Sequence, residues 1–220
     1  RKNIVVNQTN QDGYTPLFVA CWRGHVDVVQ LLLARKEIHI NQAGKRGWTP
    51  LFIACQAGHV DVVELLLASN EILINKADES GWTPLSIACS QGQLNVVKTL
   101  LARKNIAVDQ ANKHEKTPLH TACDNGHADV VQLLLAREDI RINQAMKDGR
   151  TPLFLACQKG HVDVVQLLLK RKKIDFNKEC LAGPHAGFTP LKIAQSYKHT
   201  EIVFLLQQYT AFQGSKMWSN

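Results

Sequence analysis

Thr15-Pro16-Leu17-Phe18-Val19-Ala20-Cys21 is the first of six related stretches in this chain of 220 residues. Thr-Pro-Leu returns at intervals of 34, 34, 34, 34 and 38 residues, beginning at Thr49, Thr83, Thr117, Thr151 and Thr189. Ala-Cys keeps the same spacing through the first five copies, and Gly-His occurs in four of them. A fixed period of this length indicates a repeat protein in which each repeat is one supersecondary element.

Each repeat has the signals of two short helices. Thr15 suits an N-cap and Pro16 the first helical position, so the pattern predicts a helix over 16–22. Gly24 suits a left-handed C-cap, and a second, mostly apolar helix is expected over 26–34. The polar stretch 42–47 is expected to form an exposed turn. One such helix pair cannot bury its own apolar surface, so neighbouring repeats must stack.

The repeats divide the chain into regular segments, with irregular ends. We expect repeats at 7–40, 41–74, 75–108, 109–142, 143–176 and 177–210. Residues 1–6 match the close of a repeat, which predicts further repeats upstream in a longer protein. The last repeat has a four-residue insertion within 178–187, and its second helix is expected to end at Gln207 and Gln208. The pattern is lost after Gln208, so we expect 211–220 to be a tail that folds over the last repeat or is loose.

The six segments TPLFVA, TPLFIA, TPLSIA, TPLHTA, TPLFLA and TPLKIA resemble the ankyrin-repeat family, whose motif is TPLHxA. The resemblance covers essentially the whole chain. It implies an all-α solenoid of helix–turn–helix repeats with short β-hairpin-like turns, stacked at right angles to give a concave groove. It also implies that partners bind in that groove, which the turn tips and first helices form. The period of 34 in place of 33 looks like one added residue in the connection of the 38–41 type.

Composition and charge exclude several classes of protein. Hydrophobic residues make up 45% of the chain, and no apolar run approaches the roughly 18 residues of a membrane span. Lys and Arg number 26 against 19 Asp and Glu, a net charge of +7 that permits acidic partners. The positive charge is not concentrated on one face with stacking aromatics, so nucleic acid is not the expected partner. The basic run 170–173 fits a solvated helix end, and an import signal or an anion patch is the alternative.

The cysteines and histidines are expected to be structural. Cys21 and its four equivalents recur with the repeat, as small core residues do. Stacked helices lie about 8–10 Å apart, which is wider than the roughly 5.5–6 Å between α-carbons in most disulfides. Cys180 lies in the insertion and is expected to be exposed to solvent. The histidine of Gly-His is expected to hydrogen-bond an adjacent turn.

No catalytic or metal-binding pattern accompanies these residues. The chain has no CxxC pair, phosphate-binding loop or nucleophile elbow. We therefore expect no enzymatic activity, no cofactor and no metal site. Unpaired thiols suit a reducing compartment, so we expect an intracellular, cytoplasmic protein, with the nucleus as the alternative.

The candidate binding residues are those that differ between the repeats. Scaffold positions must satisfy the same neighbours in every repeat, whereas exposed positions are free to vary. At turn tips and first-helix ends the early repeats present aromatic rings at Tyr14, Trp22, Trp48 and Trp82. The candidate cations are Arg23, Lys45, Arg46, Lys113, Lys116, Lys147, Arg150 and Lys159. The rings are either interface anchors or stiffeners that lie flat on their own turns.

We therefore expect a non-catalytic scaffold or adaptor module, monomeric as a fragment, that binds a protein or extended peptide in the groove. Its partner would present apolar side chains followed by Asp, Glu or a phosphate. One alternative is a reader of an acidic or modified peptide, phosphorylated or carrying methyl-lysine between Trp48 and Trp82, with Glu79 nearby. Another is a substrate-recruitment domain of a larger enzyme.

Overall fold

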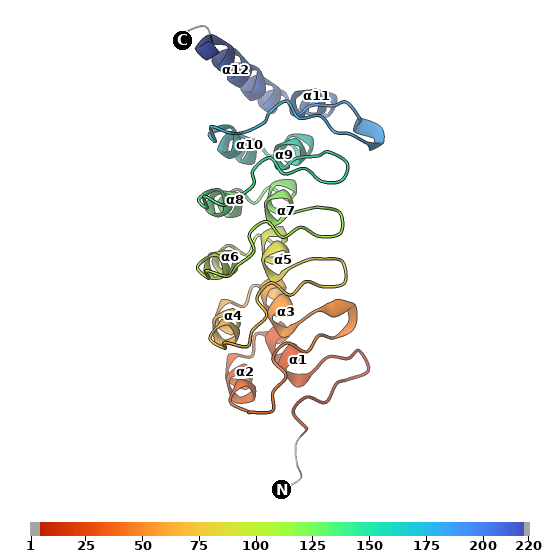
Figure 1. Ribbon diagram of the computed structural model, residues 1–220, viewed down its shortest axis with the longest axis vertical. Coiled ribbons are helices and arrows are strands. Elements are labelled where there is room, and N and C mark those ends of the chain that lie inside the picture. Colours follow the sequence, from red (N-terminus) through yellow and green to blue (C-terminus); the bar gives the residue numbers. More distant parts are fainter. Residues whose placement is uncertain (1–4, 218–220) are drawn as a thin grey trace. The chain divides into compact units, whose positions relative to one another are not determined.

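The computed structural model describes residues 5–217, with side chains through Gln213. Its described part contains only helices, turns and loops, and no β-strand. The chain forms two compact units, unit 1 at residues 1–113 and unit 2 at residues 114–220. Each unit is built from antiparallel helix pairs, so the all-α solenoid predicted from the repeats is confirmed (Figure 1).

Unit 1 contains three helix pairs whose first helices stack in one row and whose second helices stack in another (Figure 1). The turn that precedes each first helix extends away from the row of second helices. A short 3-10 turn occupies Lys45–Gly47 in the second of these turns. The pairs are α1 (Pro16–Arg23) with α2 (Val26–Leu33), α3 (Pro50–Ala57) with α4 (Val60–Leu67), and α5 (Pro84–Ser90) with α6 (Leu94–Leu101).

Unit 2 repeats this arrangement and ends in a longer helix (Figure 1). Its insertion contains a 3-10 turn at Gly183–His185. The helix pairs are α7 (Pro118–Asp124) with α8 (Ala128–Leu135), α9 (Pro152–Lys159) with α10 (Val162–Leu169), and α11 (Pro190–Ser196) with α12 (Thr200–Met217).

The predicted helix ends are confirmed. The Thr15 hydroxyl accepts the backbone N–H of Phe18 at 3.2 Å, and Thr49 does the same for Phe52 at 3.1 Å. Gly24 ends α1 with φ of 70°, a left-handed conformation that glycine adopts without strain. These caps satisfy backbone groups that short helices would otherwise leave unpaired.

Neighbouring turns are joined by backbone hydrogen bonds in the manner of a β-ladder. In unit 1 the N–H of Lys45 donates to the carbonyl of Asp12, and that of Glu79 donates to Arg46 at 2.9 Å. In unit 2 the N–H of Leu181 donates to Asp148 at 2.7 Å. The hairpin-like turns expected from the sequence are therefore present, held at a fixed distance from one another along each unit.

Two of the four Gly-His histidines, His59 and His161, are structural, as predicted. His59 Nε2 lies 3.0 Å from the carbonyl oxygen of Trp22, at the end of the preceding first helix. His161 makes the same contact with Asp124, also at 3.0 Å. Each of these imidazoles therefore ties one helix pair to the C-terminal end of the previous first helix.

Two expectations about the last repeat were wrong. The final helix does not stop at Gln208, because α12 continues to Met217. No proline and no glycine before Gly214 interrupts it, and the Tyr209 ring packs edge-on against Phe176 with centroids 5.1 Å apart. The predicted tail at 211–220 is thus helical to 217, while 218–220 lie outside the described residues, as do 1–4 of the predicted 1–6 segment.

The second wrong expectation concerns Cys180, which is only 2% exposed. Its thiol lies 3.3 Å from the carbonyl of Asp148 and 3.2 Å from that of Ala182. The insertion closes over it, since Gly187 and Phe188 form backbone hydrogen bonds with Cys180. An inserted loop that folds back on the preceding turn buries a residue that its sequence position alone would leave exposed.

Candidate functional site

An aromatic pocket lies in unit 1, between the turn tips and first helices of the second and third helix pairs. Its volume is about 390 Å³. Two of the predicted aromatic residues, Trp48 and Trp82, share this one pocket. The lining residues are Arg46, Trp48, Phe52, Gln56, Asp78, Glu79, Ser80, Trp82 and Ile87.

Trp48 forms a fixed, half-buried wall of the pocket. Its ring stacks on Phe52 with centroids 5.9 Å apart and planes within 13°. The indole Nε1 donates to Asp78 Oδ2 at 3.3 Å, and the Arg46 guanidinium lies 5.4 Å from the ring centroid. The ring therefore packs on its own first helix, and both its polar edge and one neighbouring cation are already engaged.

Trp82 differs from Trp48 in having no aromatic side chain on its own first helix to stack against. The residue four positions further on is Phe18 after Tyr14 and Phe52 after Trp48, but Ser86 after Trp82. Ser86 is buried in the N-terminal cap of α5, where it exchanges hydrogen bonds with Thr83. The half-buried Trp82 ring accordingly has no aromatic partner among residues 5–213, and it retains a surface for an incoming side chain.

The two carboxylates at the pocket rim, Asp78 and Glu79, differ in whether they are already hydrogen-bonded. Asp78 is committed to the turn, since Oδ1 accepts the backbone N–H groups of Ser80 at 2.9 Å and Trp82 at 2.8 Å. Glu79 is exposed, and its carboxylate has no ion-pair partner within the described part of the chain. The rim therefore offers one available carboxylate next to two indole rings.

The remaining aromatic candidates lie outside this pocket. Tyr14 is half-buried and stacks on Phe18 with centroids 4.2 Å apart and planes within 5°. Trp22 is 46% exposed, and the Arg23 guanidinium lies 4.9 Å from its ring centroid. Lys45 pairs with Asp12 at the turn tip, at 2.5 Å. Tyr14 and Trp48 thus lie flat against their own helix pairs, whereas Trp22 is exposed.

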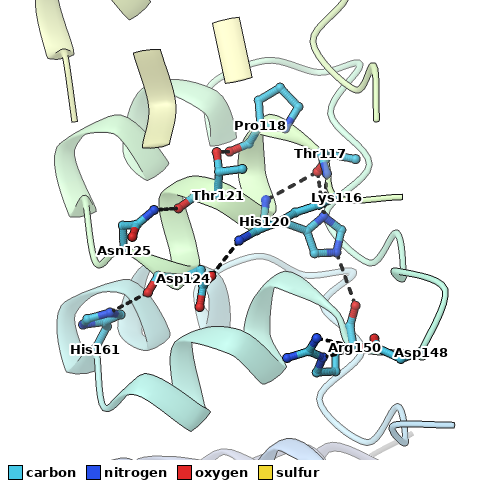
Figure 2. Close-up of polar contacts among 10 residues, drawn as sticks. All are labelled: Lys116, Thr117, Pro118, His120, Thr121, Asp124, Asn125, Asp148, Arg150 and His161. Carbon is cyan, nitrogen blue, oxygen red and sulfur yellow. Dashed lines mark hydrogen bonds and ion pairs between the residues drawn. The ribbon is translucent and has the colours of Figure 1, made fainter. Parts of the chain in front are cut away.

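The predicted cations fall into two groups. Lys116 Nζ lies 2.6 Å from Asp124 Oδ2, and their side chains are only 17% and 22% exposed. Arg150 pairs with Asp148 at 2.7 Å, with both side chains 30% exposed (Figure 2). These two cations are structural components of unit 2. By contrast Lys147 and Lys159 in unit 2, and Lys113 in unit 1, are exposed.

A buried polar network in unit 2 was not anticipated (Figure 2). The backbone N–H of Thr117 donates to His120 Nδ1 at 3.2 Å, which leaves Nε2 to donate to the carbonyl of Arg150 at 3.3 Å. Burial, together with the positive charge of Lys116, lowers the pKa of His120 to about 4. His120 is therefore a neutral structural imidazole. Two signals in the sequence pointed to it: His120 keeps the His of the TPLHxA motif, and three of the other copies have Phe at that position.

Sequence reasoning also missed Phe52, Gln56 and Asp78 as pocket residues. Phe52 was treated as scaffold, Gln56 lies at a variable first-helix end but was not chosen as a site residue, and Asp78 precedes the turn tip. Comparing the copies at Phe52 and Asp78 would have shown that these positions also vary between repeats.

Metal-binding clusters and membrane-spanning helices are both absent from the described residues. No group of three or more His, Cys, Asp or Glu side chains there is arranged to hold a metal ion. Within the same residues, no helix has both the length and the apolar character needed to cross a membrane.

Comparison with known proteins identifies the family. A family model described as ankyrin repeats in three copies matches residues 2–78, 37–112, 71–146 and 138–217. No curated protein matches the chain. Because the matched segments together span almost all of the sequence, and the structure has the stacked helix pairs and linked turns that the repeats predicted, the chain belongs to the ankyrin-repeat family.

Proposed function

We propose that this chain is a non-catalytic recognition module that binds a protein partner through the aromatic pocket of unit 1. Ankyrin repeats are in general protein–protein interaction modules. The observation that supports this site is the half-buried Trp82 ring, which lacks a stacking partner among the described residues and shares a pocket of about 390 Å³ with Trp48. An aromatic residue left in this state is typical of an interface anchor.

The pocket suits one apolar side chain from an extended or loop segment of the partner. Burying such a side chain contributes roughly 1.5–3 kcal/mol. Gln56 and Glu79 stand at the rim, where they would hydrogen-bond backbone or polar groups that flank that side chain. The partner would thus present an apolar residue with polar neighbours.

Acidic or phosphorylated groups on the partner would meet the exposed lysines in preference to the paired cations. Lys116 and Arg150 already hold Asp124 and Asp148, so a new anion would have to compete with these ion pairs. Charge reversal at Lys113, Lys147 or Lys159 therefore tests acidic recognition without breaking an internal contact.

A selected peptide and two matched variants test the proposal. Peptides are selected from a random library on the whole chain, and the dissociation constant of the best one is measured by calorimetry. We expect Trp82→Ala to weaken it by about 30-fold or more, as truncation of an interface anchor does. Phe204→Ala removes another ring, 59% exposed on α12, and should leave it unchanged. Equal affinity for Trp82→Ala and the parent chain would refute the aromatic pocket as the binding site.

A methyl-lysine reader is the second candidate function, because Glu79 is exposed beside the two indole rings of the pocket. Peptides that differ only in lysine methylation are titrated against the parent chain and Glu79→Gln. Preference for the methylated peptide, reduced in Glu79→Gln, would support this function. Equal affinity for the two peptides would exclude it.

A further inference from the structure

A basic cleft lies in unit 2, between the connections that follow the second helices α8 and α10. Its volume is about 770 Å³. It uses a different part of each helix pair from the aromatic pocket, which is built from turn tips and first helices. Six of its lining side chains are cationic, Arg137, Arg141, Lys170, Arg171, Lys172 and Lys173, and one, Glu138, is acidic; Ile140, Ile142, Asn143 and Gln144 complete it.

The same cleft exists in unit 1 without this charge. A pocket of about 480 Å³ lies between the connections that follow α2 and α4, and it includes Arg35, Lys36, Ala68, Ser69 and Glu71. Counting back three repeats, the segment 68–71, Ala-Ser-Asn-Glu, stands where unit 2 has Lys-Arg-Lys-Lys at 170–173. The fold therefore does not need positive charge here, and the charge is a specific property of the cleft in unit 2.

Stabilisation of helix ends explains only some of the six cationic residues of the cleft. Arg171 Nη2 donates to the carbonyl of Leu135 at 2.5 Å and so caps the end of α8. Arg137 pairs with Asp139 at 2.9 Å. Lys172 and Lys173 lie beyond the cap of α10, where the favourable effect of the helix dipole has fallen off. With Lys170 they are exposed, and none of the three pairs with a carboxylate among residues 5–213.

The backbone that carries these lysines is held in place. Asn143 Nδ2 donates to the carbonyl of Lys173 at 2.6 Å, and the N–H of Asp175 donates to Asn143 Oδ1 at 2.8 Å. Adjacent ammonium groups repel one another, so holding them at one opening raises the local positive potential. Such an arrangement favours an anion that carries several charges over a single carboxylate.

The lining also limits the kind of anion. The pocket has the volume of small-molecule sites, which run to about 1,000 Å³. It contains no aromatic ring on which a nucleic-acid base would stack. Gln144 Oε1 is buried and has no hydrogen-bond partner within the described part of the chain. A buried acceptor of this kind suits a ligand with hydroxyl donors.

We propose that the basic cleft binds a compact polyol that carries several phosphate groups, either free or as the headgroup of a lipid. Lys170, Lys172 and Lys173, which hold no carboxylate within the described part of the chain, supply the charge that binds the phosphate oxygens, and the arginines add to the positive potential of the cleft. Gln144 lies in the lining, and its unpaired amide oxygen can accept a hydroxyl of the polyol once the side chain turns into the cleft.

Replacing the lysines of segment 170–173 by the residues found at 68–71 in unit 1 tests whether the basic cleft binds such a ligand. The variant Lys170→Ala/Lys172→Asn/Lys173→Glu keeps Arg171 and its cap on α8. The control Lys36→Glu/Lys104→Glu changes net charge by the same amount, and both of its sites are equivalent to Lys172. Binding of myo-inositol hexakisphosphate is measured by calorimetry, and circular dichroism checks folding. We expect the affinity for the hexakisphosphate to fall roughly tenfold or more in the first variant and to stay within about twofold of the parent in the control. The affinity of the parent should fall as the salt concentration rises.

Vesicles with and without phosphatidylinositol 4,5-bisphosphate distinguish the two sources of the ligand. Binding to the soluble hexakisphosphate supports a free ligand, and binding only to the phosphoinositide vesicles supports a headgroup. The reciprocal variant Ala68→Lys/Asn70→Lys/Glu71→Lys should gain measurable binding in unit 1. Equal loss in the test and control variants, binding to neither ligand, or tighter binding to a single-stranded DNA oligonucleotide would overturn the proposal.

Discussion

The imidazole of His120, at the start of α7, donates through Nε2 to the carbonyl of Arg150, 3.3 Å away in the turn that precedes α9 (Figure 2). Its other nitrogen accepts the N–H of Thr117, so both ring nitrogens are occupied and the ring is fully buried. One side chain thus caps its own helix and ties it to the next turn. Protonation would place a second donor against the Thr117 N–H in a buried site.

The free energy of unfolding should therefore depend on pH through His120. Its pKa falls from the ordinary 6.5 to about 4 in the folded chain. Between these values the unfolded chain binds one more proton, so this contribution is present above pH 6.5 and is lost as the pH falls towards 4. From pH 7 to pH 5 the parent should lose about 2 kcal/mol more than His120→Phe. Urea unfolding at the two pH values measures this difference.

Phenylalanine is the matched replacement because Phe18, Phe52 and Phe154 occupy the equivalent position in other helix pairs. His25→Gln, at an exposed histidine, serves as the control and should keep the pH dependence of the parent. Identical pH dependence in the parent and His120→Phe would contradict a neutral buried imidazole.

Asn41 should contribute to the coupling between the first two helix pairs. Its Nδ2 donates to the carbonyl of Glu71 at 2.7 Å, and its Oδ1 accepts the N–H of Leu73 at 2.9 Å. Asn41→Ala breaks both hydrogen bonds and should cost about 1–2 kcal/mol. Hydrogen exchange should show a loss of protection at the Leu73 amide.

Asn41→Asp separates the two contacts, because the carboxylate retains an acceptor for Leu73 and loses the donor to Glu71. It should lower stability while keeping protection at Leu73. Equal loss of protection in the alanine and aspartate variants would mean that the acceptor contact is not what protects this amide.

The ends of the short helices could be predicted because the same capping residues recur in successive repeats. Thr15 and Gly24 recur at fixed spacing, so an N-cap and a left-handed C-cap follow from steric and hydrogen-bonding rules alone. Contacts between segments that differ from repeat to repeat could not be predicted in the same way. Lys116 pairs with Asp124 across eight residues, beyond the three- and four-residue spacings at which helical side chains meet, so this contact depends on the path of the turn. The burial of Cys180 likewise depends on how an insertion folds back.

The aromatic pocket could be predicted only in part from the sequence. The aromatic positions before each Thr-Pro were found by comparing copies, but that comparison did not say which rings are covered. Coverage depends on a second residue, Phe52 under Trp48 or Ser86 in the position under Trp82. Both positions are readable from the repeats once the packing of a ring on its own first helix is known.

The six cysteines should be nearly inert in the folded chain. All six are buried. Burial raises the pKa of Cys21 to about 12 and also raises the pKa of Cys89. The thiolate is the reactive species, so at pH 8 Cys21 should react with Ellman's reagent roughly a thousandfold more slowly than an unfolded thiol. Absorbance measured with and without guanidinium gives the ratio.

Lys36→Cys supplies the control, because it places a thiol at an exposed site. One equivalent should react rapidly in this variant and none in the parent. Rapid reaction of one equivalent in the parent would show that a cysteine, with Cys180 in the insertion the first to test, is accessible in solution.

Gly81 should be far less replaceable than Gly187, although both have positive φ, 87° and 75°. A Cβ on Gly81 would lie 2.9 Å from the Cα of Asn112 and from the N of Lys113, whereas one on Gly187 would meet nothing within 4 Å. Alanine costs about 1–2 kcal/mol at either position for the left-handed conformation alone. At Gly81 the next turn must also move, which strains the hydrogen bond from Lys113 N–H to the Ser80 carbonyl.

We therefore expect Gly187→Ala to lower the free energy of unfolding by about 1 kcal/mol, and Gly81→Ala by at least about 2 kcal/mol. Urea denaturation followed by circular dichroism compares the two. Because repeat arrays can unfold in parts, hydrogen exchange at the Lys113 amide is measured as well. That amide should lose protection in Gly81→Ala alone. Similar costs for both variants, with Lys113 still protected, would show that the linked turns yield easily and do not fix the spacing of the aromatic pocket.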